Sequence, residues 1–217
     1  MKCATAQVTF LESMFQVYKS RSESRAIWSE WLRSRQGGRI SWELRFNQNL
    51  SEEEKLIFFE DLRKLEASMP IAYVLGEIIW ADVKWKVDKR ALIPRPETEE
   101  LLQAMLNEVN PSDRIVDACT GSGCIAIATK LKAPNTHLIA FDISTDALDL
   151  AKENAETNNV QIEWHNSNLL GPIPDWVSIS KDDIWISNPP YIPVSEILDK
   201  SLGFEPEMAL YVPDDSP

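Results

Sequence analysis

Apolar residues in the first 75 positions recur at the spacing of amphipathic helices. Two stripes with this spacing are Leu11, Met14, Phe15 and Tyr18, and later Phe58, Leu62, Leu65 and Met69. Ser51 and Glu54 have the spacing of a capping box, and Gly37 with Gly38 is expected to end an earlier helix. The pattern predicts a small helical bundle. It contains no plausible catalytic constellation, so any function there would be recognition.

The hydrophobic period then changes from about 3.6 to 2. Apolar and polar residues alternate from Val83 to Asp88, and the run Glu77 to Trp80 precedes them across Ala81 and Asp82. Two short alternating runs separated by two residues are typical of an antiparallel hairpin. A β-hairpin linker is therefore expected here.

Beyond Pro94 short apolar runs alternate with helical patterns. Strands are predicted at Arg114 to Ala118 and His137 to Phe141, with helices at Cys124 to Leu131 and Ser144 to Asn158 between and after them. A further apolar strand is predicted at Ile184 to Ser187. This βαβαβ order is typical of a parallel, doubly wound α/β sheet with right-handed crossovers.

Length and composition agree with this division. With ~150 residues in a typical domain, 217 residues suggest one domain and a smaller addition. We therefore expect a helical domain at 1–75, a hairpin linker at 76–93 and an α/β domain at 94–217. The net charge of −12 disfavours binding through many phosphates.

Cysteine usage and the N-terminal sequence indicate the compartment. Cys3, Cys119 and Cys124 are an odd number without paired-ligand spacing, which disfavours a disulfide framework and a zinc site. His137 and His165 are isolated from carboxylates at metal-ligand spacing, so no metal is expected. The sequence shows neither a signal peptide nor an apolar run of membrane-spanning length. A cytoplasmic protein without membrane contact is predicted.

A glycine-rich turn follows the first predicted strand. In the segment Asp117 to Gly123, Gly121 and Gly123 allow close approach of a ligand to the backbone and to the free N–H groups of the next helix. Asp142 ends the second strand, where a carboxylate can accept both hydroxyls of a ribose. Their matched positions favour a nucleoside cofactor over the alternative, a tight turn and a helix-capping aspartate. They do not distinguish a nicotinamide from S-adenosylmethionine.

The distinguishing motif is Asn188-Pro189-Pro190-Tyr191, directly after an apolar strand. Two prolines make a rigid turn that presents carbonyl acceptors beside the Asn188 amide. Two acceptors, the Asn188 side-chain oxygen and the Pro189 carbonyl, could hold both hydrogens of a conjugated NH₂ group, and Tyr191 could stack on its plane. The motif indicates methylation of an amide or aromatic amine.

Taken together, these motifs resemble the HemK/PrmC family, the release-factor glutamine methyltransferases. The resemblance rests on Asn188 to Tyr191, the Thr-Gly-Ser-Gly turn, the run Leu92 to Glu99 and Phe204 to Pro206, and it covers nearly the whole chain. The run Leu92 to Glu99 also separates the chain from the sister enzymes that methylate a ribosomal-protein glutamine.

The resemblance implies a class I S-adenosylmethionine-dependent methyltransferase with a Rossmann-like sheet. It also implies the site residues: for the cofactor Cys119, Thr120, Gly121, Ser122, Gly123, Asp142, Asn168, Leu169 and Asn188, and for the substrate amide Asn188, Pro189, Pro190 and Tyr191. Cys119 replaces the usual first glycine, and Asn168 stands where aspartate is usual, which predicts a weaker adenine contact. Arg95 is expected either to order a loop beside the substrate site or to pair with an acid.

The expected function is methyl transfer to the glutamine of the Gly-Gly-Gln motif of peptide chain release factors, by a monomer that binds no nucleic acid directly. The alternatives are a ribosomal-protein glutamine methyltransferase, an adenine-amine methyltransferase acting on nucleic acid, and an inactive binding fragment. The resemblance also implies a sheet ordered 3-2-1-4-5-7-6, of which only four strands are recognisable. The sequence therefore leads us to expect a C-terminally incomplete sheet, poor solubility and weak activity.

Overall fold

The computed structural model describes residues 1–172, 183–196 and 200–213. They form two compact units, one of Met1–Gly76 with Lys200–Phe204 and one of Glu77–Asp199 with Glu205–Pro217. The hairpin lies in the second unit. The expected division at 75 and 93 is not tested beyond this, and parts of the expected domain 94–217 lie outside the described residues.

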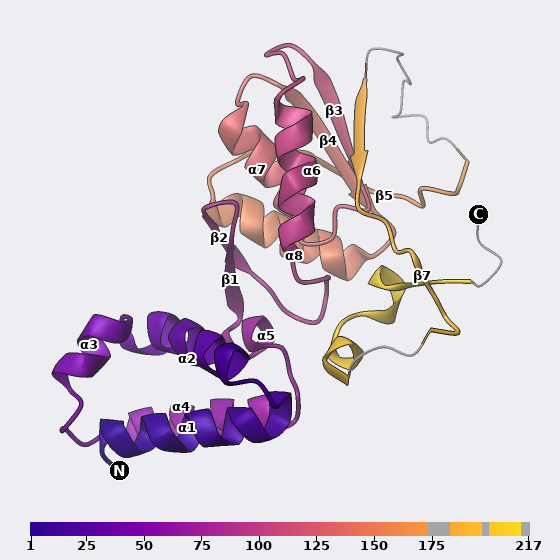
Figure 1. The fold of residues 1–217 in the computed structure, drawn as a ribbon. Coiled ribbons are helices and arrows are strands. Elements are labelled where there is room, and N and C mark those ends of the chain that lie inside the picture. The colour runs from indigo at the N-terminus through magenta and orange to yellow at the C-terminus, as the bar shows by residue number, and fades with distance from the viewer. Residues whose placement is uncertain (173–182, 197–199, 214–217) are drawn as a thin grey trace. The chain divides into compact units, whose positions relative to one another are not determined.

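Besides the 3₁₀ helix at Lys200–Phe204, the first unit contains five α-helices among its described residues (Figure 1). They are α1 (Cys3–Tyr18), α2 (Arg21–Gln36), α3 (Arg39–Leu44), α4 (Glu52–Glu66) and α5 (Ile71–Leu75). The capping box at Ser51 and Glu54 is confirmed, with both reciprocal hydrogen bonds present. Gly37 ends α2 in the left-handed conformation, as predicted.

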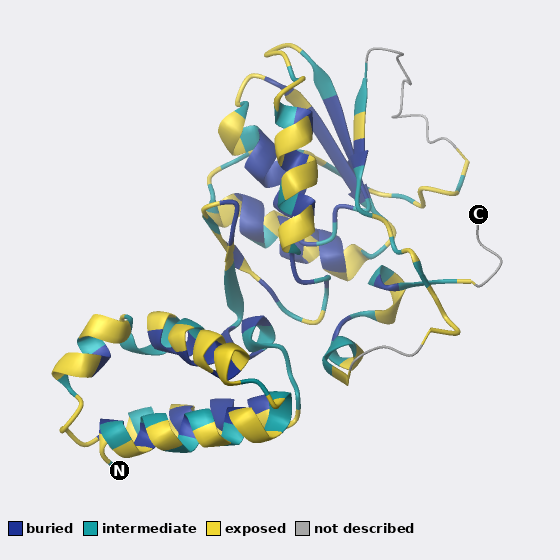
Figure 2. Ribbon diagram, in the orientation of Figure 1, coloured by how far each residue is buried: buried dark blue, intermediate teal, exposed yellow. Residues whose placement is uncertain are grey.

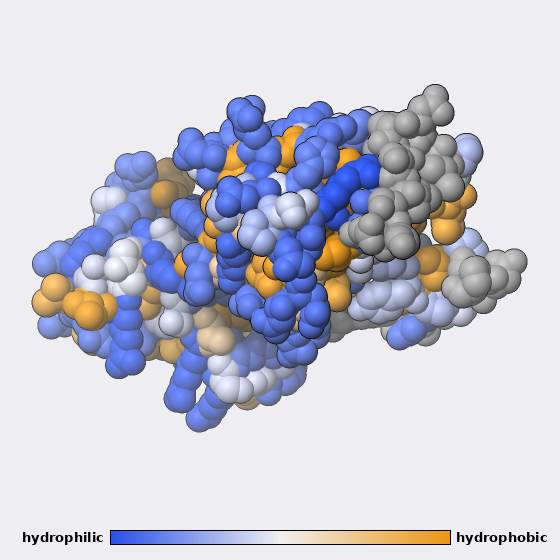
Figure 3. All heavy atoms as spheres, turned by 90° about the horizontal axis from the view of Figure 1, so that it is seen from above, coloured by the Kyte–Doolittle hydropathy of each residue, from blue (hydrophilic) through white to orange (hydrophobic). Residues whose placement is uncertain are grey.

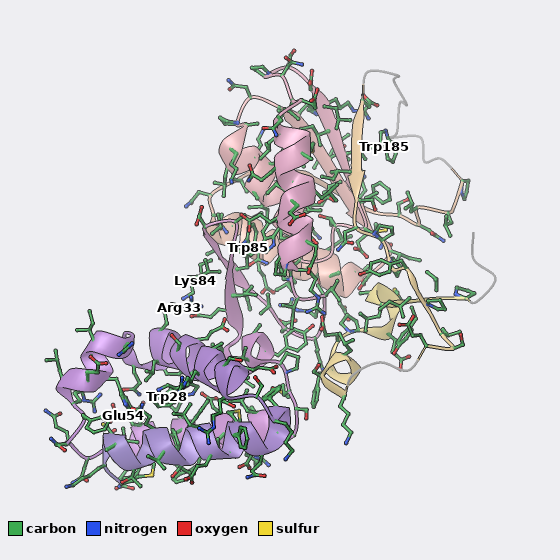
Figure 4. The ribbon with its side chains drawn as sticks, viewed as in Figure 1. Trp28, Arg33, Glu54, Lys84, Trp85 and Trp185 are labelled. Atoms are coloured by element: carbon green, nitrogen blue, oxygen red, sulfur yellow. The ribbon has the colours of Figure 1, made fainter. Side chains whose placement is uncertain are left out.

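An aromatic cluster fills the core of this unit. Trp28, labelled in Figure 4, stacks on Trp31 with ring centroids 5.3 Å apart and meets Trp42 edge to face at 5.2 Å. Phe10 and Phe58 complete the cluster. Edge-to-face and offset arrangements suit the quadrupoles of the rings, so the cluster adds specific geometry to its apolar burial.

The predicted stripe on α1 is partly wrong. The residues buried on this helix are Cys3, Ala6, Phe10 and Met14. Phe15 is 37% exposed, and its ring faces the guanidinium of Arg21 at 5.8 Å. Met14 and Phe15 both continue a helical spacing, but the face that meets the core is centred on Phe10, which turns Phe15 toward solvent.

A buried carboxylate links three helices of the unit. Asp61 on α4 accepts hydrogen bonds from the Trp31 indole at 3.0 Å and from Arg35 Nε at 2.9 Å. Arg35 also donates to the Val74 carbonyl of α5. Because Asp61 is buried and paired, removal of either partner would leave a charge without compensation.

The hairpin forms where it is predicted, but its second strand ends at Lys86 rather than at Asp88. Strand β1 (Glu77–Trp80) pairs antiparallel with β2 (Val83–Lys86). Ala81 and Asp82 both have positive φ, 51° and 63°, which gives the two-residue turn whose twist matches the strands. Hydrogen bonds join β2 to helix α8 (Thr145–Thr157) of the same unit, as described below.

A parallel sheet forms the centre of the second unit (Figure 1). Strands β3 (Arg114–Ala118), β4 (His137–Asp142), β5 (Glu163–Asn166) and β6 (Ile184–Ser187) are ordered β5-β4-β3-β6. The helices of this unit are α6 (Pro96–Leu106), α7 (Cys124–Lys132) and α8 (Thr145–Thr157). This order is that of the first four strands of the predicted Rossmann-like sheet, 3-2-1-4, and helices and a hairpin precede it.

Burial follows this arrangement. Figure 2 shows β3 and β4 in dark blue; α7 is buried from Cys124 to Thr129, whereas α8 is buried on one side and exposed on the other. In the view of Figure 3 hydrophilic residues predominate, and hydrophobic ones form small separate groups. No helix among the described residues is long and apolar enough to cross a membrane.

The C-terminal segment consists of short elements. Two 3₁₀ helices, Lys200–Phe204 and Glu207–Ala209, lie between β7 (Ile192–Pro193) and β8 (Tyr211–Val212), and the two strands pair in parallel. Trp185 on β6, labelled in Figure 4, is 41% exposed.

We predict that Asp61→Ala destabilises the helical unit by about 3 to 5 kcal/mol, because Arg35 and the Trp31 indole both lose their buried acceptor. Urea unfolding followed by tryptophan fluorescence measures the change. Glu60→Ala removes an exposed pair with Lys64 on the same helix and should cost less than about 1 kcal/mol. Equal losses in the two variants would contradict the role assigned to Asp61.

Candidate active site

The register of the sheet brings the predicted site segments to one edge. Ala118 at the end of β3 lies opposite Phe141 of β4 and Ser187 of β6. Because the three strands are parallel, the residues that follow them emerge at the same carboxyl edge, where α/β proteins bind ligands. The turn after β3, Asp142 and Asn188 therefore share this edge.

The turn between β3 and α7 has an unusual backbone. Cys119, Gly121 and Gly123 have φ values of 59°, 56° and 80°. Cys119 thus adopts the left-handed conformation that glycine adopts freely, at a cost of roughly 1 to 2 kcal/mol for a residue with a Cβ. Burial raises the pKa of its thiol to about 11, so the thiol stays protonated near neutral pH. A side chain at Gly123 would also lie 3.0 Å from the Ala151 methyl.

Asp142, the last residue of β4, is hydrogen-bonded to this turn. One carboxylate oxygen accepts from the Gly121 N–H at 2.9 Å and the other from the Ser144 N–H at 2.9 Å. Each oxygen retains a lone pair, so the carboxylate can still accept from two hydroxyl groups. Asp142 thus makes the hydrogen bond at the start of α8 that the alternative interpretation, a helix-capping aspartate, requires. This bond does not prevent the carboxylate from binding a ligand.

Asp117 is a candidate that the sequence reasoning did not single out. Its Oδ2 accepts from the Thr120 hydroxyl at 2.6 Å and the Ala126 N–H at 3.1 Å. Its Oδ1 is buried without a partner among the described residues, and burial raises the pKa of the carboxyl to about 7. The available signal was an acidic residue at an otherwise apolar strand position, directly before a glycine-rich turn.

Asn154 on α8 is a second residue that the sequence did not reveal. Its Oδ1 accepts from the Lys86 N–H at 2.8 Å, and its Nδ2 donates to the carbonyls of Lys86 and Ser122 at 3.1 and 3.0 Å. The side chain is buried and uses its oxygen and both N–H groups. It therefore holds the hairpin and the turn after β3 to the same helix.

The segment after β6 presents acceptors. Asn188 Nδ2 donates to the Thr98 hydroxyl of α6 at 3.3 Å, and no donor among the described residues lies on Asn188 Oδ1. The Ser187 hydroxyl donates to the Ala118 carbonyl at 2.7 Å, which ties the start of this segment to β3. Pro189 is exposed, and Tyr191 is 73% exposed, so its ring is open to a planar ligand.

Arg95 pairs with Glu205 of the Phe-Glu-Pro segment. The other Glu205 oxygen accepts from the Ile93 N–H at 3.0 Å, and the Trp80 indole donates to the Arg95 carbonyl at 2.8 Å. The structure thus shows the pairing with an acid that was one of the two roles considered for Arg95. The same pairing joins the run from Leu92 to Glu99 to a segment that lies 110 residues further along the chain.

Asn168 and Leu169 are exposed beyond β5. The Asn168 oxygen accepts from the Leu170 N–H at 3.0 Å, and its NH₂ group can act only as a donor. His165 lies 2.7 Å from Glu163. Within the described ranges, no group of three or more His, Cys, Asp or Glu residues could hold a metal ion.

These residues fit a cationic nucleoside ligand. The turn after β3 offers a backbone in a close-approach conformation, Asp142 has free lone pairs for hydroxyls, and Asp117 has an unpaired buried oxygen that can accept from a cationic N–H. At the same edge of the sheet, after β6, Asn188 offers a neutral oxygen for an amide. The site can hold a charged cofactor beside a neutral NH₂ substrate.

Comparison with known proteins gives consistent results. The family model for the methyltransferase small domain matches residues 96–200. The release factor glutamine methyltransferase of Lactococcus lactis is 39% identical over 186 residues, which are 83% of this chain and 67% of that protein. The enzyme of the same name from Enterococcus faecalis is 37% identical over 87% of this chain and 68% of its own length. The chain therefore spans about two thirds of these relatives.

Among solved structures, the catalytic domain of hMettl16 in complex with the MAT2A 3′UTR hairpin 1 has a TM-score of 0.45 and 15% sequence identity. The match covers 87% of this chain and 67% of that one.

We predict that Asp117→Asn changes the pH dependence of stability. The folded-state pKa of about 7 lies above the unfolded value near 3.8, so the folded protein binds more protons and its stability falls as pH rises from about 4 to about 7. Asparagine lacks this titration, and its oxygen can still accept from Thr120 and Ala126. The stability of the variant relative to wild type should therefore rise across this window and level off above it, as measured by urea unfolding between pH 4 and pH 8.

The exposed Asp149→Asn serves as the control for a lost carboxylate. A stability difference between Asp117→Asn and wild type that stayed constant from pH 4 to pH 8 would refute the buried titration.

Proposed function

The chain belongs to the family of release factor glutamine methyltransferases, S-adenosylmethionine-dependent protein-glutamine N-methyltransferases, and we propose that it methylates the glutamine of the Gly-Gly-Gln motif of peptide chain release factors. The observation that supports this most is the free Asn188 oxygen at the sheet edge that also holds the turn after β3 and Asp142. We also propose that the chain acts as a monomer without direct contact to nucleic acid.

S-Adenosylmethionine supplies an electrophilic methyl group on a sulfonium when it is bound. We assign Cys119 to Gly123, Asp142, Asn168 and Leu169 to the cofactor, and Asp117 in addition. Asp142 would accept from the ribose hydroxyls with the lone pairs that Gly121 and Ser144 leave free. Asp117 would accept from a cationic N–H through its unpaired oxygen, and that pairing would favour its ionised form.

The residues after β6 would act on the glutamine. An amide nitrogen is a poor nucleophile because its lone pair is delocalised into the carbonyl. The Asn188 oxygen and the Pro189 carbonyl would accept its two hydrogens, orient the nitrogen and increase its electron density, while Tyr191 would stack on the amide plane. These groups would contribute mainly by position and polarisation.

The proton balance needs no strong base. The amide nitrogen becomes acidic only as its new bond to carbon forms, so its proton can leave late, to water or to a hydrogen-bonded acceptor. Asn188 and the Pro189 carbonyl are neutral acceptors, which suit a nitrogen that develops positive charge. In this proposal the chain provides alignment rather than proton abstraction.

We assign recognition of the release factor to the helical region 1–75. It has its own aromatic core, so its outer face is available to a partner. Ile40 and Leu44 lie one turn apart on α3 and are 76% and 78% exposed, as is usual for apolar residues that a partner covers. The hairpin at 76–93 and the region from 94 onward would then present the catalytic edge.

We predict that Asn188→Ala lowers the turnover number by on the order of 100-fold or more, the scale of losing one preorganised polar contact to a transition state. Affinity for S-adenosylmethionine should stay within about threefold, because the turn after β3 and Asp142 remain. Transfer of tritium from labelled S-adenosylmethionine to a release factor measures the first quantity, and calorimetry measures the second. Normal turnover in Asn188→Ala would contradict the amide-holding role.

The same assay separates the alternatives. Wild-type protein should label the release factor, and a release factor with asparagine in place of the glutamine should remain unlabelled, because the shorter side chain withdraws the nitrogen from the reaction geometry. If only a ribosomal protein were labelled, the chain would be a ribosomal-protein methyltransferase. If duplex DNA or RNA were labelled and the release factor were not, it would be a nucleic-acid methyltransferase. Cofactor binding without transfer to any of these would identify a binding protein.

We predict that Asn168→Asp tightens S-adenosylmethionine binding about 2- to 10-fold, the value of one added hydrogen bond. In the wild type the Asn168 oxygen already accepts from the Leu170 N–H, and the Asn168 NH₂ group and the adenine amine are both donors, which cannot pair with each other. An aspartate keeps the bond to Leu170 and offers its second oxygen to the amine.

Asn159→Asp provides the matched control in calorimetry, since it adds the same charge after α8, at the end of the helix that leads into β5. The assignment of Asn168 to adenine would be wrong if both variants, or neither, bound the cofactor more tightly.

A further inference from the structure

Hydrogen bonds within the segment itself, from the hairpin and from Glu205 hold the segment Leu92 to Glu99 in place. Pro96 begins α6, and the Thr98 N–H donates to the Arg95 carbonyl at 3.1 Å. The Trp80 indole donates to the same carbonyl, and Glu205 accepts from Arg95 and Ile93. The first turn of α6 is therefore held rigidly, and with it the buried side chain of Thr98.

Thr98 contacts the residue that the proposed function places on the substrate. Its hydroxyl oxygen lies 3.3 Å from Asn188 Nδ2, across 90 positions of the chain. Asn188 lies in a loop after β6, where a side-chain amide can rotate by 180° and exchange its oxygen and nitrogen. Only one of the two orientations directs the oxygen toward the N–H groups of a bound amide.

We propose that Thr98 is a positioning residue that stabilises the productive orientation of the Asn188 amide; this rests on the function proposed above. When Asn188 Oδ1 accepts from the substrate, its Nδ2 faces Thr98 and needs an acceptor. The hydroxyl oxygen provides that acceptor. An apolar side chain of the same shape would leave a partly buried N–H without a partner in the state in which the amide is held, and would thereby raise the barrier to transfer.

The isosteric substitution Thr98→Val tests this role. The turnover number should fall about 10-fold, the scale of one unsatisfied, partly buried donor, with little change in cofactor affinity. Thr98→Ser retains the hydroxyl and should recover most of the lost rate. Thr129→Val makes the same chemical change at a buried helical threonine whose hydroxyl donates to the Ile125 carbonyl, and it should keep the wild-type rate.

A double variant separates positioning from general damage. If Thr98 acts through the Asn188 amide, then Thr98→Val should have almost no further effect in the Asn188→Ala background. A full 10-fold loss in that background, or a rate equal to wild type in Thr98→Val alone, would overturn the inference.

The side-chain amide signals of Asn188 give a readout that does not depend on activity. They can be assigned in ¹⁵N-labelled protein by their absence in Asn188→Ala. The Nδ2 protons should exchange more slowly in wild type and Thr98→Ser than in Thr98→Val, because only the first two keep the acceptor. Equal exchange in all three would overturn the inference, whereas a wild type that left release factor unmethylated would refute the proposed function instead.

Discussion

The parallel pairing of β3 with β4 on one side and β6 on the other is the constraint on which the site depends. Because Ala118 lies opposite both Phe141 and Ser187, the next residues of three strands leave the sheet at one edge. A slip of one residue in either pairing would turn alternate side chains to the opposite face and would separate Asp142 or Asn188 from the turn after β3. The hydrogen bonds from Gly121 to Asp142 and from Ser187 to Ala118 depend on the same register.

Segments far apart in the sequence support this edge. Glu205 is buried and accepts from the Arg95 side chain and the Ile93 N–H, so the Phe-Glu-Pro segment and the start of α6 form one structure. Asn154 likewise joins two distant segments, because it donates to the carbonyls of Lys86 and Ser122. Glu205 and Asn154 therefore hold the loops around this edge in place.

The carboxylates and the neutral acceptors of the site lie in different segments. Two carboxylates, Asp117 and Asp142, accept hydrogen bonds from the turn after β3. Burial raises the pKa of Asp117, and the charge of Asp142 raises it further. The segment after β6 offers neutral acceptors, Asn188 and the Pro189 carbonyl. A sulfonium cofactor gains from nearby negative charge, while an amide nitrogen needs orientation more than charge. This division agrees with a reaction in which alignment, not proton abstraction, lowers the barrier.

The sequence by itself determined the elements that depend on local periodicity and on short motifs. β3, β6 and the capping box at Ser51 have the predicted bounds, and the hairpin forms at the predicted place, because their signals lie within a few residues of one another. The assignment of the predicted site residues to ligands stays a prediction. Only the tertiary structure decided which side of α1 faces the core, since Met14 and Phe15 fit the helical spacing equally well. It also decided the partners of Asp117, Asn154 and Thr98, because burial and hydrogen bonding between distant segments leave no periodic trace in a sequence.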